Sequence, residues 1–159
     1  MSTKLRVAVA KGDGIGPEIM DAVISIFESA NVPIDYQYVD MGKWVFDKGF
    51  SNGMTPEAKQ TIEDLGILFK GPMETPKGKG VKSVNVTARK TWNTYANDRK
   101  FQTLSGVDTV FSKAGVAIDL TIVRENIEDT YGGIEHMLTH DVAVGRRIIK
   151  RTDSDQVIR

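Results

Sequence analysis

The feature that most constrains the fold is a short apolar segment, residues 4–10, that runs directly into a cluster of glycines. Its length and its valines are typical of a strand, and the glycines at positions 12, 14 and 16 predict a tight loop. Pro17 then stands where the first turn of a helix tolerates proline, and apolar residues recur every three to four positions from Ile19 to Phe27. The sequence therefore opens with a strand, a glycine loop and a helix, which is the building unit of an α/β fold.

The alternation of strands and helices continues along the chain. A short helix is predicted over residues 55–65, with Thr55 as its N-cap, Pro56 in its first turn and Gly66 at its end. The other expected elements are strands over 34–39, 67–70, 99–104 and 118–123, a loop over 71–82, a helix over 86–97 and an extended hairpin within 140–149. This order predicts an α/β protein.

Charge and composition exclude several classes of function. The 21 Lys and Arg residues balance 21 Asp and Glu residues, whereas nucleic-acid-binding domains usually carry a basic excess, so we expect no nucleic-acid partner. The chain has no cysteine, which excludes disulfides, thiolate zinc sites and cysteine nucleophiles. No segment reaches the roughly 20 apolar residues of a membrane span, and the N-terminal segment is too short for a signal peptide. We therefore expect a cytoplasmic protein with no membrane partner.

The glycine loop invites a dinucleotide-binding interpretation. That fingerprint requires a third glycine after two intervening residues, and here glycines stand at 12, 14 and 16 with Pro17 following. The Rossmann pattern is therefore not met. The loop could still bring the backbone close to a ligand, or its glycines could serve only a tight turn, and the sequence favours neither.

Polar residues that could bind a substrate gather in the second half of the chain. They are Ser83, Asn85, Arg89, Arg99 and Arg124. Three guanidinium groups would suit a ligand with several carboxylates, because each can hold one in a bidentate pair, although a single arginine is more often a surface residue.

Other residues are ambiguous by themselves. Tyr131 could donate a proton if neighbouring cations lowered its pKa, or it could be a half-buried core residue. His136 and His140 have a helical metal spacing, but the sequence around them offers no third ligand, so no metal site is predicted there.

Four segments together resemble a known family. They are KGDGIGPEI at 11–19, KGPMETP at 70–76, SVNVTARKTWNTYANDR at 83–99 and IVRENIEDTYGGIEH at 122–136. The chain resembles the β-decarboxylating dehydrogenases of the isocitrate/isopropylmalate dehydrogenase family, and closely the NADP-dependent isocitrate dehydrogenases. The resemblance implies the two-domain α/β fold of that family rather than a Rossmann domain. It places residues 1–104 in the first part of the large domain and residues 105–159 at the start of the small, dimer-forming domain.

The resemblance also implies roles for the polar residues. Ser83 and Asn85 would donate to the carboxylate that distinguishes isocitrate from related substrates, and Arg89, Arg99 and Arg124 would clamp carboxylates. Tyr131 matches the general acid that protonates the enolate carbon after CO2 has left, and Thr75 matches a position near the nicotinamide. In isopropylmalate dehydrogenases apolar residues replace the pair at 83 and 85, so the polar side chains here favour isocitrate over isopropylmalate as the substrate. One departure is that Asp98 and Lys100 flank Arg99, where the family often has Leu and Pro.

The chain is shorter than members of this family. The aspartates that bind Mg2+ or Mn2+, the catalytic lysine of the partner subunit and the adenosine-binding loops are expected beyond residue 159. We therefore expect an N-terminal portion of a homodimeric, NADP-dependent isocitrate dehydrogenase, inactive by itself. The alternatives are a truncated paralogue that serves as a non-catalytic interaction module, and an isopropylmalate-type dehydrogenase.

Overall fold

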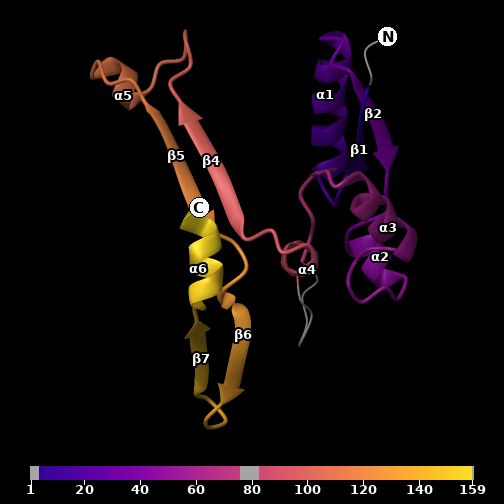
Figure 1. The fold of residues 1–159 in the computed structure, drawn as a ribbon, viewed down its shortest axis with the longest axis vertical. Coiled ribbons are helices and arrows are strands. Elements are labelled where there is room, and N and C mark those ends of the chain that lie inside the picture. The colour runs from indigo at the N-terminus through magenta and orange to yellow at the C-terminus, as the bar shows by residue number, and fades with distance from the viewer. Residues whose placement is uncertain (1–3, 76–82, 159) are drawn as a thin grey trace. The chain divides into compact units, whose positions relative to one another are not determined.

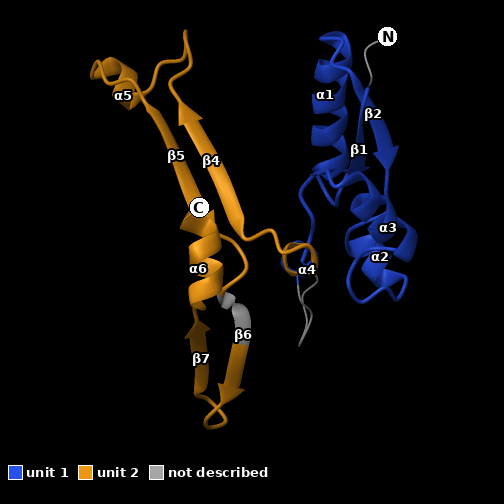
Figure 2. Ribbon diagram, in the orientation of Figure 1, with its two compact units in different colours: residues 1–87 blue, residues 88–159 orange. Residues whose placement is uncertain are grey.

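The computed structural model describes residues 4–75 and 83–158, apart from the side chains of residues 129–133. The chain divides into two compact units, residues 1–87 and residues 88–159 (Figure 2). This division follows the contacts within the present chain, and the domain boundary expected between residues 104 and 105 stays a prediction.

The first unit is built on a three-stranded parallel sheet in the order β2-β1-β3. Figure 1 labels β1 and β2 of this sheet. The strands are β1 Leu5–Ala10, β2 Ile34–Tyr38 and β3 Leu68–Lys70. Helix α1, Gly16–Ser29, follows β1 and buries Met20 and Ile24 against Val7 and Val9. The predicted strand, glycine loop and helix are therefore confirmed, and β1 is the central, most buried strand because it has a neighbour on each side.

This unit also contains helices α2, Lys43–Asp47, and α3, Pro56–Leu65. The hydroxyl of Thr55 accepts a hydrogen bond from Ala58 N at 3.1 Å, which confirms the predicted N-cap of α3. Gly66 ends α3 in the left-handed conformation, with φ of 69°, as a helix-terminating glycine does. Helix α2 has five residues and is not predicted by the sequence pattern.

Two antiparallel hairpins form most of the second unit. Helix α4, Val84–Thr91, spans the boundary between the units and leads to β4, Ala96–Gln102. After the short helix α5, Val110–Lys113, strand β5, Asp119–Glu125, returns along β4. The second hairpin pairs β6, Asp129–Met137, with β7, Ala143–Ile148, and helix α6, Arg151–Ile158, follows it.

The prediction of a helix over 86–97 is wrong at both ends. Helix α4 begins two residues earlier and ends at Thr91. Asn93 adopts φ of 47°, a left-handed conformation that interrupts the helical path, and β4 begins at Ala96 rather than at Arg99. The hairpin predicted within 140–149 starts earlier, because its first strand is β6; helices α5 and α6 were not predicted. Among the described residues, every helix is too short or too polar to cross a membrane.

Candidate active-site elements

The glycine loop after β1 lies in direct contact with the loop after β3. A Cβ atom on Gly12, which has φ of +83°, would lie 2.0 Å from the carbonyl oxygen of Pro72, and one on Gly71 would lie 2.2 Å from the carbonyl oxygen of Lys11. Both positions therefore require glycine for close packing of backbone on backbone. At Gly12 the structure supports the turn interpretation, whereas Gly14, with φ of +59°, faces open space.

Asp13 connects three segments of the first unit through its carboxylate. Its Oδ1 and Oδ2 accept from Lys43 N at 3.0 and 2.8 Å, and Oδ2 also accepts from Glu74 N at 3.0 Å. The backbone N–H of Asp13 donates to Pro72 O at 2.9 Å. Thr75, the residue predicted near the nicotinamide, is exposed and follows directly after Glu74. Asp13 was not singled out from the sequence, because these contacts join residues about thirty and sixty positions away.

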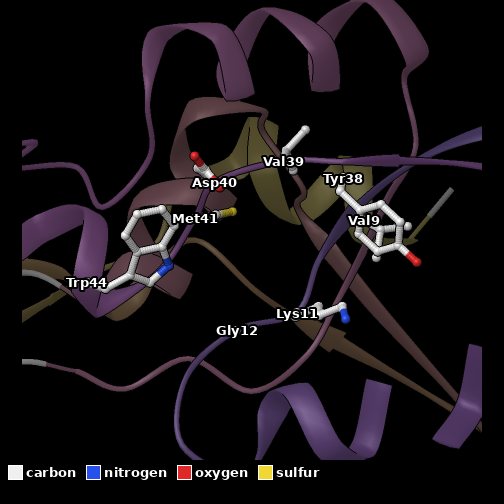
Figure 3. A pocket seen from close by; sticks show the side chains of 8 residues that line it. All are labelled: Val9, Lys11, Gly12, Tyr38, Val39, Asp40, Met41 and Trp44. Carbon is white, nitrogen blue, oxygen red and sulfur yellow. The ribbon is translucent and has the colours of Figure 1, made fainter. Parts of the chain in front are cut away.

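A cavity of about 330 Å3 opens beside the carboxyl ends of β1 and β2 (Figure 3). Trp44 and Tyr38 stand on opposite sides of it, with Lys11 and Asp40 among the residues between them. Lys11 Nζ lies 2.6 Å from Asp21 Oδ1, and this hydrogen bond raises the pKa of the lysine. The residues predicted for substrate binding do not line this cavity.

Three of the predicted substrate-binding residues lie in or next to helix α4: Ser83 directly precedes it, Asn85 lies in its first turn and Arg89 lies in its last turn. The carbonyl oxygen of Ser83 accepts from Thr87 N at 2.9 Å, so Ser83 stands where the helix begins. Asn85 and Arg89 are four residues apart and therefore lie on one face of the helix. The side-chain Oδ1 of Asn85 is buried and has no hydrogen-bond partner among the described residues. A buried amide oxygen without a partner is costly, so a ligand that donates to it would be favoured.

The register of the first hairpin places Arg99 and Arg124 on one face. Arg99 lies opposite Ile122, and Arg124 lies opposite Asn97. Side chains alternate along a strand, and directly opposed residues point to the same side, so the two arginines are diagonal neighbours on that face. Arg99 Nε donates to Asn97 Oδ1 at 3.3 Å, which is consistent with this arrangement.

Tyr131 lies in β6, and its side chain is outside the described residues. The register of β6 against β7 shifts between Asp129 and Ile134, and Tyr131 lies within this irregular stretch.

Three buried or half-buried polar residues follow Arg124 directly and support the hairpin. Glu125 Oε1 accepts from Ile127 N and Glu128 N, both at 2.7 Å, and Asn126 Nδ2 donates to Thr94 O at 2.9 Å. Glu128 is 7% exposed and accepts from Lys150 N at 2.7 Å. Glu128 Oε1 also lies 3.6 Å from Lys150 Nζ. The charged and amide residues after Arg124 were visible in the sequence, but their hydrogen-bond partners named here are backbone atoms, which no side-chain pattern identifies.

Comparison with known proteins decides the family. The family model described as isocitrate/isopropylmalate dehydrogenase matches residues 6–159. The chain belongs to the isocitrate/isopropylmalate dehydrogenase family. A Thermus thermophilus protein named isocitrate dehydrogenase [NADP] is 42% identical over 96% of this chain and 30% of its own length. Subunit 2 of the mitochondrial isocitrate dehydrogenase [NAD] of Saccharomyces cerevisiae is 38% identical over 98% of the chain and 41% of its own length.

Solved structures give the same family assignment. The crystal structure of isocitrate dehydrogenase from Methylococcus capsulatus superposes with a TM-score of 0.82 at 36% identity, over 96% of this chain and 45% of that one. The predicted α/β fold of the isocitrate/isopropylmalate dehydrogenase family, in place of a Rossmann domain, is confirmed. The chain spans less than half the length of each of these relatives.

The resemblance to the family implies a divalent metal ion, Mg2+ or Mn2+. Metal sites for Mg2+ or Mn2+ require several oxygen ligands gathered at one point. In the parts of the chain that the structure describes, no group of three or more His, Cys, Asp or Glu side chains could hold a metal ion. The described residues therefore do not fit a complete metal site.

Proposed function

We propose that this chain contributes the N-terminal part of an enzyme that oxidises and decarboxylates isocitrate to 2-oxoglutarate, with NADP and a divalent metal. The observation that carries the proposal is the 42% identity, over 96% of the chain, to a protein named isocitrate dehydrogenase [NADP]. The polar side chains of Ser83 and Asn85 also support isocitrate as the substrate. A cytoplasmic location and a homodimeric state belong to the same proposal, as does inactivity of residues 1–159 by themselves.

The charge of the substrate supports the proposed arginine roles. Isocitrate carries three carboxylates, and Arg89, Arg99 and Arg124 provide three guanidinium groups that can each form a bidentate pair. Arg99 and Arg124 share one face of the β4–β5 hairpin, so one substrate could contact both. A lysine at either position would keep the charge and lose the fork of paired donors.

Ser83 and Asn85 are proposed to select isocitrate over substrates with an apolar tail. The hydroxyl and the amide offer donors to a carboxylate, and Asn85 Oδ1, which no described residue contacts by a hydrogen bond, offers an acceptor to a substrate hydroxyl. An apolar tail at the same place would leave these groups without partners. A site built to hydrogen-bond a substrate discriminates strongly against an analogue that cannot do so.

The remaining roles follow the order of the reaction. NADP, when bound, would supply the acceptor for the hydride that the substrate loses on oxidation. We assign to Tyr131 the protonation of the enolate carbon after CO2 has left, and to Thr75 a contact near the nicotinamide. No step is assigned to a metal ion, because the described residues do not supply its ligands.

Steady-state kinetics on the full-length natural gene product test the proposal. Formation of NADPH is followed by absorbance with isocitrate and Mg2+ or Mn2+, against a mock-purified control. We expect turnover with isocitrate and much less with isopropylmalate. Turnover with isopropylmalate in preference to isocitrate, or none with either substrate, would contradict the proposal.

A further inference from the structure

The loop that carries Thr75 is attached to the segment at the end of β1 at three successive points. Gly71 N donates to Ala10 O at 2.9 Å, and Pro72 O accepts from Asp13 N at 2.9 Å. Glu74 N, one residue before Thr75, donates to Asp13 Oδ2 at 3.0 Å. Asp13 therefore supplies two of the three attachments, and its carboxylate reaches Glu74, the residue next to Thr75.

The same carboxylate also fixes the start of α2. Lys43 N donates to both of its oxygens, and Gly42 leaves room for them, because a Cβ atom on Gly42 would lie 2.7 Å from Asp13 Oδ1. Gly42 has φ of +135°, a conformation that other residues rarely adopt. Two backbone N–H groups thus point at one ionised acceptor, and such charge-assisted hydrogen bonds are shorter and stronger than neutral ones.

We propose that Asp13 is a positioning residue for the cofactor: its carboxylate fixes the loop of residues 71–75 so that Thr75 is presented to the nicotinamide. This inference rests on the role proposed for Thr75. Asp13 acts through the Glu74 N–H. Without the carboxylate, the loop would remain attached at Gly71 and Pro72, and the end that carries Thr75 would lose its attachment to Asp13.

The variants Asp13→Ala and Asp13→Asn test the hydrogen bond between the Asp13 carboxylate and Glu74 N, called the tether below, separately from general folding. Alanine removes both acceptor oxygens. Asparagine keeps the shape, and its single oxygen can take the place of Oδ2, but its NH2 group would then face Lys43 N, which donates to Oδ1 at 3.0 Å in the native protein. The matched control is Asp21→Asn, which removes a carboxylate from the neighbouring helix α1, where it pairs with Lys11, and leaves the Asp13 contacts in place.

The experiment measures two quantities in the full-length protein: backbone amide hydrogen exchange at Lys43 and Glu74, and the KM values for NADP and isocitrate. For Asp13→Ala we expect faster exchange at both amides and a KM for NADP raised by up to about tenfold, the change expected if loss of one charge-assisted hydrogen bond lowers the population of the correctly placed loop to about one tenth. The KM for isocitrate should stay within about twofold, and Asp13→Asn should lie between Ala and the native protein. Asp21→Asn should change neither quantity.

The outcomes distinguish this inference from the proposed function. If the native protein does not turn over isocitrate with NADP, the proposed function fails, and amide exchange still reports on the tether. Faster exchange with an unchanged KM for NADP, or equal rises in both KM values, would overturn the positioning role. Unchanged exchange at Glu74 would show that the tether does not exist. If Asp13→Ala does not fold, Asp13→Asn decides by the same two measurements.

Discussion

Replacing Ser83 and Asn85 together by leucine tests how the enzyme selects its substrate. If both side chains bind the carboxylate particular to isocitrate, the double variant loses two hydrogen bonds to a charged group. Each costs about 1.5–3 kcal/mol, so the transition state loses about 3–6 kcal/mol and kcat/KM for isocitrate falls by about two to four decades. The buried Oδ1 of Asn85 has no hydrogen-bond partner among the described residues, so leucine breaks no hydrogen bond between that oxygen and any of them.

The assay compares kcat/KM for isocitrate and for isopropylmalate in the full-length protein. Isopropylmalate carries an apolar group where isocitrate carries the carboxylate, so its kcat/KM should fall much less or rise. The direction of the change in specificity identifies the role of the pair more clearly than the size of either change.

The competing explanation is that Ser83 and Asn85 only stabilise the first turn of α4, where the carbonyl oxygen of Ser83 accepts from Thr87 N. The matched control is Thr55→Ala, which removes an observed helix cap in the same unit and should lower the free energy of unfolding by about 1 kcal/mol without changing specificity. A parallel fall in kcat/KM for both substrates, with a melting temperature lowered as in Thr55→Ala, would refute the role in recognition.

Three further predictions use other parts of the structure. Gly12→Ala should prevent the first unit from folding normally, because its Cβ would lie 2.0 Å from Pro72 O. The Cβ of Gly14→Ala meets no atom within 4 Å, so this variant should lose only about 1–3 kcal/mol of stability through backbone strain, and the melting temperatures of the two variants check the difference. Tyr36→Phe should leave the free energy of unfolding at pH 7 unchanged or raise it, because the Tyr36 hydroxyl is buried without a partner among the described residues. Burial also raises the pKa of Tyr36 above that of the unfolded chain, so ionisation of this hydroxyl opposes folding above about pH 10. In denaturant titrations above about pH 10, Tyr36→Phe should therefore lose less stability than the native protein. Arg124→Lys should raise the KM for isocitrate about tenfold in steady-state kinetics while leaving the melting temperature within a few degrees.

Local signals explain why the first unit was predicted well from the sequence. Pro17 and Pro56 lie in the first turns of α1 and α3, and Thr55 and Gly66 mark the two ends of α3. Each of these residues restricts its own backbone or bonds to a group within a few positions. The five-residue helix α2 lacks such signals, because its first N–H is capped by Asp13 from thirty positions away.

The second unit was predicted less well because its strands lack clear alternation. Strand β4 is exposed from Asp98 to Gln102, and described side chains of β6 are exposed from Ile134 to Met137, so burial does not impose a period of two on their sequence. Trp92 and Tyr95, three residues apart, extended the helical pattern past the residue where the backbone turns, Asn93. The candidate polar residues and Tyr131 were selected from the sequence itself, whereas their specific roles and the choice of Thr75 came from the resemblance to the family. These roles stay predictions.

The shared face of Arg99 and Arg124 depends on the register of β4 and β5, which the sequence does not show. A slip by one residue would move one arginine to the opposite face. Contacts at both ends of the hairpin oppose such a slip. Near β5, Asn126 N donates to Tyr95 O at 3.0 Å and Asn126 Nδ2 donates to Thr94 O at 2.9 Å; at the other end, Ile118 N donates to Thr103 Oγ1 at 2.7 Å. A buried amide and one hydroxyl, neither proposed to touch substrate, therefore fix which side of the hairpin carries the two guanidinium groups.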